Sequence, residues 1–314
     1  MHRFLWFALL LTACVGKAPL TLEPAPAGAG GSDGGAGGMG GSAGGGPGCV
    51  HPDAETLAMK LYPGTVDLAF DAECRAYLPT VVSGQDRVYV TDGATTDTIL
   101  GMGNFNLSAV GIDPVRDIIF VAQHTDNSIC HLAAASSNSA FSTIATGVPS
   151  GSDRWHSAVL QRCQTSIAVD SRGCVWVPNF DGAGTLSCIR LEGEVSTEVT
   201  GQPYIESVAL DHSEEVFFAA DELVKHYDRS SKEVTTIFTA GAPVLDFAFA
   251  PNGELFVETT AGVIERRLPS GSSEVIDTVV DQGRLAVSPD GYLVRIASDT
   301  PSPASFVEWA LPDL

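Results

Sequence analysis

SIAVDSRGCVWV, at Ser166–Val177, is the stretch that decides the fold. Apolar and small residues lead to Asp170, a short turn ends at Gly173, and apolar and aromatic residues follow. Aspartate opens a turn by accepting hydrogen bonds from the backbone that follows it. Apolar residues on both sides of such a turn are typical of two antiparallel strands. The stretch therefore predicts a β-hairpin.

The same pattern occurs five more times, as the repeats of a single structural unit would. The other copies read DLAFDAECRAYL at Asp67–Leu78, AVGIDPVRDIIFV at Ala109–Val121, SVALDHSEEVFF at Ser207–Phe218, DFAFAPNGELFV at Asp246–Val257 and RLAVSPDGYLVR at Arg284–Arg295. The residues that open the turns are Asp71, Asp113, Asp170, Asp211, Ala250 and Ser288, spaced by 42, 57, 41, 39 and 38 residues. One insertion between the second and third copies explains the single long spacing.

Further alternating segments follow the hairpins and predict additional strands. They lie at Arg87–Thr91, Thr98–Leu100, Ile189–Leu191, Val234–Phe238, Val263–Leu268 and Val275–Val279. Four short strands in a unit of about 40 residues are typical of a β-propeller blade. We therefore predict an all-β fold, a six-bladed β-propeller built of four-stranded blades.

The register of the first blade and the closure of the ring stay open. SGQDRVYV, which begins at Ser83, fits the turn pattern as well as the first copy does. After Arg295 one convincing strand remains, at Ser305–Leu311. The last blade would then borrow a strand from Leu57–Tyr62, which would seal the ring between the first and last blades.

The repeats resemble those of NHL and gluconolactonase/regucalcin-type propellers. The stretch Val88-Tyr89-Val90-Thr91-Asp92 also resembles the YVTN repeat of surface-layer propellers, with Asp92 in place of the asparagine. The resemblance covers residues 67–311 through short, degenerate motifs. It implies the fold, and it implies very little about function, because propellers serve many functions.

The first 13 residues predict a lipoprotein signal peptide. His2 and Arg3 precede an apolar run, Phe4–Leu11, that is far too short to cross a bilayer of about 30 Å. The sequence that ends at Cys14, Leu-Thr-Ala-Cys, resembles the lipobox of bacterial lipoproteins, which implies cleavage before Cys14 and its acylation. An ordinary signal peptide with an incidental cysteine is the alternative. Because Val15 is not the aspartate that retains some lipoproteins at the inner membrane, we expect an outer-membrane anchor in the cell envelope.

Residues 14–48 predict a disordered tether, and residues 49–314 the propeller domain. Thirteen of the 21 residues from Gly28 to Gly48 are glycine, and such a segment has too little apolar surface to fold. We expect a flexible coil with a root-mean-square span of roughly 30 Å. The tether would hold the domain away from a membrane surface.

The chain is strongly acidic, with 17 Lys and Arg against 38 Asp and Glu. An acidic surface repels phosphate backbones, so nucleic acid is excluded as a partner. The membrane, reached through the N-terminal lipid, and a protein or glycan partner remain. The alternative is that the acidic surface only makes the protein soluble and binds no partner.

Six cysteines remain after Cys14, and an even number in an exported domain suggests disulfides. Cys174 and Cys188 are symmetric about Asp181 and would face each other across a hairpin. Cys130 and Cys163 flank the insertion and could close it, and Cys49 with Cys74 would fix the end of the tether to the first blade. Free buried thiols are the alternative.

One rim of a propeller collects the loops in which binding groups usually lie. We expect His124 and Asp181 on that rim, together with the insertion at 147–162. Arg154, Trp155 and His156 in the insertion place an aromatic face between a cation and a titratable ring, which is the most ligand-like cluster of the chain. The tryptophan could equally cover the edge of a neighbouring blade.

Glu206 and Asp246 are candidate metal ligands at the mouth of the central channel. Carboxylates that converge there could hold Ca²⁺ or Mg²⁺, which take six or more oxygen ligands. The gluconolactonase-type resemblance implies a metal held by Glu, Asn and Asp, but the full set has no counterpart here. Asp246 could instead pair with Arg284, which has the equivalent position in the next blade.

Residues 49–314 contain no HExxH motif and no GxSxG elbow, so the sequence does not indicate nucleophilic catalysis. The sequence favours a membrane-tethered propeller that binds a ligand or protein in the cell envelope. The alternative is a metal-dependent propeller hydrolase or lyase of the gluconolactonase-like type. A purely structural envelope protein is a third hypothesis.

Overall fold

The computed structural model describes parts of one compact unit, Gly46–Leu314. The described residues are 66–82, 85–91, 96–100, 106–124, 130–136, 140–146, 148, 166–179, 184–279, 283–297 and 306–309. All the regular elements within these ranges are β-strands. In this part of the chain there is no helix long and apolar enough to cross a membrane. The tether and the signal peptide lie outside the described residues.

The strands form antiparallel sheets in chain order, which we number as blades 1 to 6. Blade 1 contains β1 (Ala69–Phe70), β2 (Ala76–Val82), β3 (Gln85–Thr91) and β4 (Thr96–Leu100), and blade 2 contains β5 (Asn106–Ile112), β6 (Ile118–His124), β7 (Cys130–Ser136) and β8 (Ser142–Thr146). Blade 3 contains β9 (Ala168–Val169), β10 (Cys174–Asn179), β11 (Thr185–Arg190) and β12 (Val195–Val199), and blade 4 contains β13 (Ile205–Leu210), β14 (Val216–Ala220), β15 (Leu223–Tyr227) and β16 (Val234–Thr239). Blade 5 contains β17 (Val244–Phe249), β18 (Leu255–Thr259), β19 (Val263–Arg267) and β20 (Ser273–Thr278), and blade 6 contains β21 (Gly283–Val287), β22 (Leu293–Ala297) and β23 (Phe306–Trp309).

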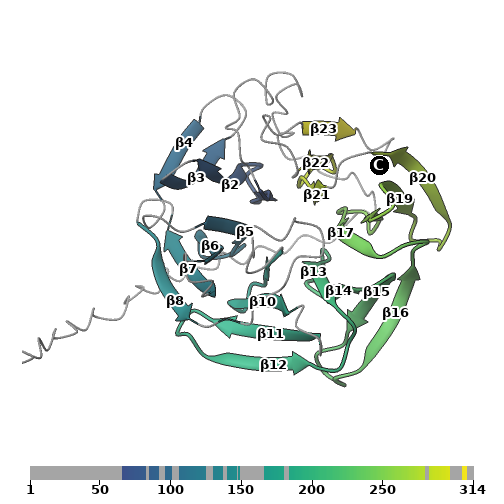
Figure 1. Ribbon diagram of the computed structural model, residues 1–314, viewed down its shortest axis with the longest axis horizontal. Coiled ribbons are helices and arrows are strands. Elements are labelled where there is room, and N and C mark those ends of the chain that lie inside the picture. The colour runs from purple at the N-terminus through teal and green to yellow at the C-terminus, as the bar shows by residue number, and fades with distance from the viewer. Residues whose placement is uncertain are drawn as a thin grey trace, which may run out of the picture. The chain divides into compact units, whose positions relative to one another are not determined.

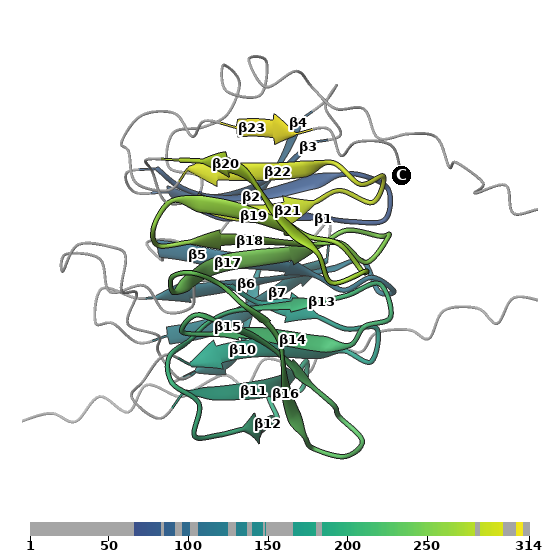
Figure 2. The same ribbon diagram turned by 90° about the vertical axis from the view of Figure 1, so that its right-hand side faces the viewer.

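The sheets are arranged as a propeller around a central axis (Figure 1). The first strands of successive blades contact one another in order, from β1 through β5, β9, β13 and β17 to β21, and β21 contacts β1. These first strands are the inner strands of the ring. The fourth strands lie at the periphery, as β16 and β20 do where they face the viewer in Figure 2.

We predicted six four-stranded blades, and this number is wrong for the described residues. Only five blades have four strands there. Blade 6 has three strands among the described residues: β23 pairs directly with β22, and no described strand pairs with its other edge. The predicted last strand, Ser305–Leu311, coincides with β23. The segment Leu57–Tyr62, which was expected to complete this blade, lies outside the described residues.

The predicted hairpins are confirmed, and the turn-opening aspartates make the expected bonds. Asp170 Oδ1 accepts hydrogen bonds from the amides of Arg172 and Cys174, both at 3.0 Å. Asp71 does the same for Glu73 and Arg75, at 3.0 and 2.8 Å, which selects the first of the two registers for blade 1. The alternative turn, which begins at Ser83, instead separates β2 from β3.

Apolar side chains fill the spaces between neighbouring blades. One cluster joins Phe120 of blade 2 to Val175 of blade 3, another joins Phe217 of blade 4 to Phe247 of blade 5, and a third joins blades 6 and 1. Since each blade buries both faces in this way, its inner strands are held in fixed positions around the axis.

The predicted disulfide between Cys174 and Cys188 is confirmed, with 5.4 Å between its Cα atoms. Cys174 lies opposite Arg190, and Cys188 lies opposite Trp176, so the bridge crosses the hairpin diagonally rather than directly. Cys74 and Cys130 are also disulfide-bonded. The cysteines predicted to pair with them, Cys49 and Cys163, lie outside the described residues, so these two pairings stay predictions.

Candidate functional site

A cavity of about 260 Å³ lies at the centre of the ring, where the six inner strands meet. Most of the residues that line it are apolar, but the surface that faces the cavity is more polar than apolar, and polar side chains come from Asp67, Ser166 and Asp246. Its volume lies just below the range of about 300–1,000 Å³ that is usual for ligand pockets. The cavity is therefore of a size for a small ligand.

The small residue of each sequence repeat keeps this space open. Five of the six lie on the cavity wall: Ala69, Gly111, Ala168, Ala209 and Ala248. At Gly111 a Cβ atom would lie 2.8 Å from Cγ2 of Val169 on the next inner strand, which is too close for a real contact. The repeat thus uses small side chains to bring the inner strands close together while leaving a channel between them.

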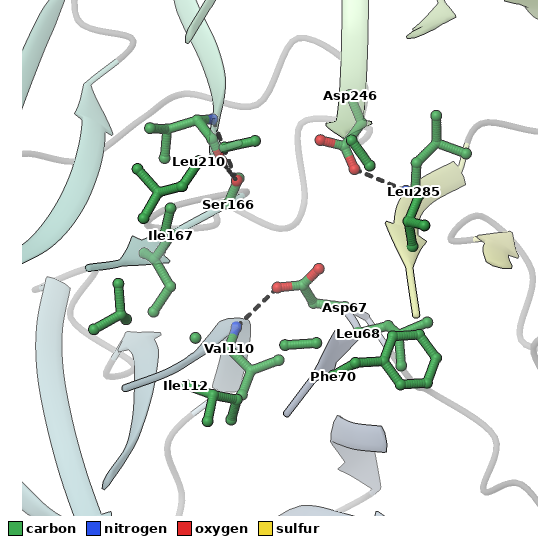
Figure 3. Close-up of a pocket in the computed structure, with 18 of the residues that line it drawn as sticks. Asp67, Leu68, Phe70, Val110, Ile112, Ser166, Ile167, Leu210, Asp246 and Leu285 are labelled. Carbon is green, nitrogen blue, oxygen red and sulfur yellow. Dashed lines mark hydrogen bonds between the residues drawn. The ribbon is translucent and has the colours of Figure 1, made fainter. Parts of the chain in front are cut away.

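The three polar side chains of the lining have the same repeat position, four residues before the residue that opens the turn. Asp67 accepts a hydrogen bond from the amide of Val110, at 2.8 Å through Oδ2. Asp246 accepts one from the amide of Leu285, also at 2.8 Å through Oδ2. Figure 3 shows both carboxyl groups projecting into the space between the strands, each bonded to the next blade.

Ser166 makes the corresponding contact between blades 3 and 4. Its Oγ donates to the carbonyl oxygen of Val208, at 3.0 Å, and lies 3.3 Å from the amide of the same residue. A polar side chain therefore links blade 1 to 2, blade 3 to 4 and blade 5 to 6 at one level of the channel (Figure 3).

Both carboxyl groups are buried, and burial disfavours their charged forms. Desolvation raises the pKa of Asp67 to about 7, although the Val110 amide and the Arg284 guanidinium act in the opposite direction. Desolvation also raises the pKa of Asp246 to about 6, opposed first by Arg284. The charge of Asp246 further raises the pKa of Asp67, which indicates that the two groups interact across the cavity.

Arg284 is the cation of this group. It is buried on β21, at the repeat position of Asp67 and Asp246, and its Nη1 donates to the carbonyl oxygen of Leu245 at 3.3 Å. The positive charge of Arg284 lowers the pKa of Asp246, and a direct pairing of the two side chains stays a prediction.

A buried ion pair lies close enough to Asp246 to act on its pKa. Both oxygens of Glu258 accept from Arg295, at 2.8 Å each, and Glu258 Oε1 also accepts from the amide of Gly283. The negative charge of Glu258 raises the pKa of Asp246. This ion pair fixes blade 5 against blade 6 beside the cavity.

A second cavity adjoins the first at the turn end of the inner strands. Phe70, Leu210, Phe249 and Val287 line both cavities. Beyond them the lining includes the turn residues Asp71, Asp211, His212 and Ser288. The channel therefore has an acidic level, an apolar middle and a polar mouth.

Several predicted site residues lie outside the described residues, namely Arg154, Trp155, His156 and Asp181. His124 ends β6, but its side chain is not described. Their assignment to a ligand site stays a prediction.

The predicted metal ligands do not form a metal site among the described residues. Asp246 lines the cavity, whereas Glu206, buried on β13, does not. No group of three His, Cys, Asp or Glu residues in the described part of the chain could hold an ion. Ca²⁺ and Mg²⁺ need about six oxygen ligands, so the described residues do not fit such an ion.

Asp67 is the functional candidate that the sequence reasoning missed. It begins the first repeat and has the same position in that repeat as Asp246 has in its own, so an alignment of the repeats would have identified it. The pattern within the first repeat could not identify Asp67, because Val110, to which Asp67 bonds, is 43 residues away in the sequence.

No protein-family model and no curated protein matches the chain. Its structure is similar to virginiamycin B lyase from Staphylococcus aureus, with a TM-score of 0.54 and 10% identity over 82% of this chain and 87% of that one. It is also similar to an oxidoreductase from Thermus thermophilus described as a glucose dehydrogenase (TM-score 0.55, 14% identity, 78% and 96% covered). A third match is a chain of a nidogen/laminin complex (TM-score 0.52, 9% identity, 68% and 79% covered).

The likeness is one of fold. These neighbours are β-propellers of the NHL and YVTN type, which confirms the predicted resemblance at that level. They include enzymes and a component of a protein complex, and at such low identity none of their activities transfers to this chain.

Proposed function

We propose that the protein is a cell-envelope binding module that holds a small ligand in the central cavity of its propeller. The observation that carries the proposal is the cavity itself, because all six inner strands line it. Apolar lining residues with a few convergent polar groups, here Asp67 and Asp246, are typical of ligand sites.

A cavity-filling variant tests this proposal. Ala209 is half-buried on the wall, so Ala209→Leu would place extra methyl groups in the channel. Ala261→Leu is the matched control, because Ala261 is exposed in a turn of blade 5. The probe is benzyl alcohol, and its binding is measured by saturation-transfer NMR on the full-length chain in a nonionic detergent.

We expect benzyl alcohol to bind the wild type and Ala261→Leu, and to bind Ala209→Leu at least ten times more weakly. Equal binding to all three proteins would place the probe outside the cavity and contradict the proposal.

The envelope location is part of the same proposal and rests on the lipobox-like sequence that ends at Cys14. Several acyl chains would anchor the protein stably, since each buried methylene contributes about 0.8 kcal/mol. The test is metabolic labelling with palmitate, followed by separation of the inner and outer membranes. Label in the outer-membrane fraction that Cys14→Ser abolishes supports the anchor, and unchanged label after Cys14→Ser contradicts it.

Acid–base catalysis is the second candidate function, and the pKa of Asp67 is the observation that favours it. A carboxyl group with a pKa of about 7 is suited to accept and return a proton at neutral pH. The similarity to virginiamycin B lyase suggests that antibiotic as a first substrate to assay. Turnover that Asp67→Asn abolishes would support the enzyme. A metal-dependent version of the enzyme would need ligands from outside the described residues.

A further inference from the structure

We infer that the central cavity takes an organic cation, a primary ammonium group on a short apolar body, with the ammonium held between Asp67 and Asp246. The inference rests on the proposed binding function and names the chemical class of the ligand.

The first observation is that each carboxyl group has an oxygen available. Asp67 and Asp246 are only 8% and 6% exposed, and each uses Oδ2 to accept from a backbone amide. The amides of the residues that follow them, Leu68 and Phe247, also favour the charged forms. No hydrogen bond of normal geometry to either Oδ1 atom is found within the described part of the chain, and Figure 3 shows the two groups directed into the cavity. Each Oδ1 can therefore accept a hydrogen bond from a donor on a ligand in the cavity.

The second observation is the charge at this level of the channel. When both are ionised, Asp67 and Asp246 carry two negative charges, and Arg284 supplies one positive charge. The adjacent Glu258 and Arg295 neutralise each other. One negative charge is left in a buried setting, and burial is the main cause that raises the pKa of both carboxyl groups. A ligand cation would balance the charge.

The third observation is the apolar lining next to the acidic level. Leu68, Ile167 and Phe247 lie one residue beyond the polar position, and Phe70 and Phe249 lie further along the channel. Aromatic and aliphatic walls bind an apolar body and give an ammonium group a low-polarity surrounding, in which its attraction to carboxylates is stronger. One end of the ligand is thus charged and the other is apolar.

A bare metal ion fits this arrangement less well. The Val110 and Leu285 amides direct N–H donors at the carboxyl groups, and Arg284 brings a positive charge. A divalent ion needs about six oxygens, whereas an ammonium group needs acceptors for only three N–H bonds.

The experiment compares benzylamine with benzyl alcohol, two probes of similar shape that differ in charge. Their dissociation constants are measured by NMR titration at pH 7.5 on the full-length chain in a nonionic detergent. The variants are Asp67→Asn and Asp246→Asn, in which the amide oxygen can still accept from the neighbouring blade. Asp277→Asn is the matched control, because Asp277 is half-exposed on β20 of the blade that carries Asp246.

We expect benzylamine to bind the wild type and Asp277→Asn at least ten times more tightly than benzyl alcohol. Asp67→Asn and Asp246→Asn should each reduce that preference to threefold or less. A second arm adds CaCl₂ at 1 mM, which should leave benzylamine binding unchanged.

Equal affinity for the two probes in the wild type would overturn the ammonium assignment and leave the proposed binding function intact. Displacement of benzylamine by 1 mM CaCl₂ would replace the organic cation with an inorganic one and also overturn the inference. If neither probe binds the wild type, the proposed binding function itself fails.

Discussion

At the scale of single residues, Asp67 and Asp246 show how one carboxyl group serves both the fold and a site. One oxygen of each bonds to a backbone amide of the next blade, and the other faces the cavity. The structural bond fixes the position of the side chain, so its free oxygen is presented without the entropic cost of ordering it at binding.

The raised pKa of Asp67 makes stability depend on pH. The unfolded chain releases this proton near pH 3.8, and the folded protein only near pH 7, so the folded state holds more protons between these values. The contribution of Asp67 therefore falls as the pH rises from 4 to 7. Relative to Asp67→Asn, we expect the wild type to lose roughly 2–4 kcal/mol over this window. Urea unfolding of both proteins at several pH values measures it.

Asp246 and Arg284 are the charged groups that act on the pKa of Asp67, and they are the same in both proteins. A constant difference in stability from pH 4 to 7.5 would contradict the raised pKa.

The Glu258–Arg295 pair gives a second prediction at this scale. Its side chains are 0% and 3% exposed, so Arg295→Met would leave an uncompensated buried carboxylate. We expect a loss of about 3–5 kcal/mol in the free energy of unfolding. The matched control is Arg190→Met, because Arg190 and Glu194 form an exposed pair, 3.9 Å apart. That change should cost less than about 1 kcal/mol. Equal losses in the two variants would count against a buried pair.

At the scale of the element, blade 5 contains two glycines with similar backbone angles and different surroundings. Gly253 and Gly262 have φ values of 84° and 72°, both in the left-handed region. A Cβ at Gly253 would meet nothing closer than Pro269 Cγ at 3.7 Å, whereas at Gly262 it would overlap the carbonyl oxygen of Val279.

Alanine at Gly253 should therefore cost only the backbone penalty, about 1 kcal/mol. Alanine at Gly262 should cost about 2 kcal/mol more, because β19 and its neighbouring turn must shift. Thermal unfolding of the two variants compares them, and a smaller loss at Gly262 would disprove the close contact.

The elements were well predicted wherever the signal is local. The turn that opens at Asp170, the strand at Val234–Phe238 and the pairing of Cys174 with Cys188 depend on residues close in sequence. The strand count of blade 6 was not well predicted: three strands are found among the described residues, and the sequence repeat, which covers only the first two strands of a blade, does not fix the number that follow. The acidic level of the channel was found only in part: Asp246 was identified, and Asp67 was not.

At the scale of the whole molecule, the chain has a net charge of −21. Such a charge repels itself in the compact state, and salt screens that repulsion over about 10 Å at 0.1 M. We expect the melting temperature at pH 7.5 to rise by several degrees between 10 and 200 mM NaCl. KCl should act equally, since screening does not depend on the identity of the cation. A rise with only one of the two salts would indicate specific ion binding instead.

The polar links at the channel divide the ring into pairs of blades. Asp67, Ser166 and Asp246 each bond a blade of odd number to the blade that follows it. Apolar clusters join every pair of neighbouring blades, and a backbone hydrogen bond from the Val244 amide to the Asp221 carbonyl oxygen also joins blades 4 and 5. Hydrogen bonds tolerate little misalignment, whereas apolar contact has no preferred direction. We therefore expect the three interfaces without such a side-chain bond at the channel to resist a change in the diameter of the bore less than the three that have one.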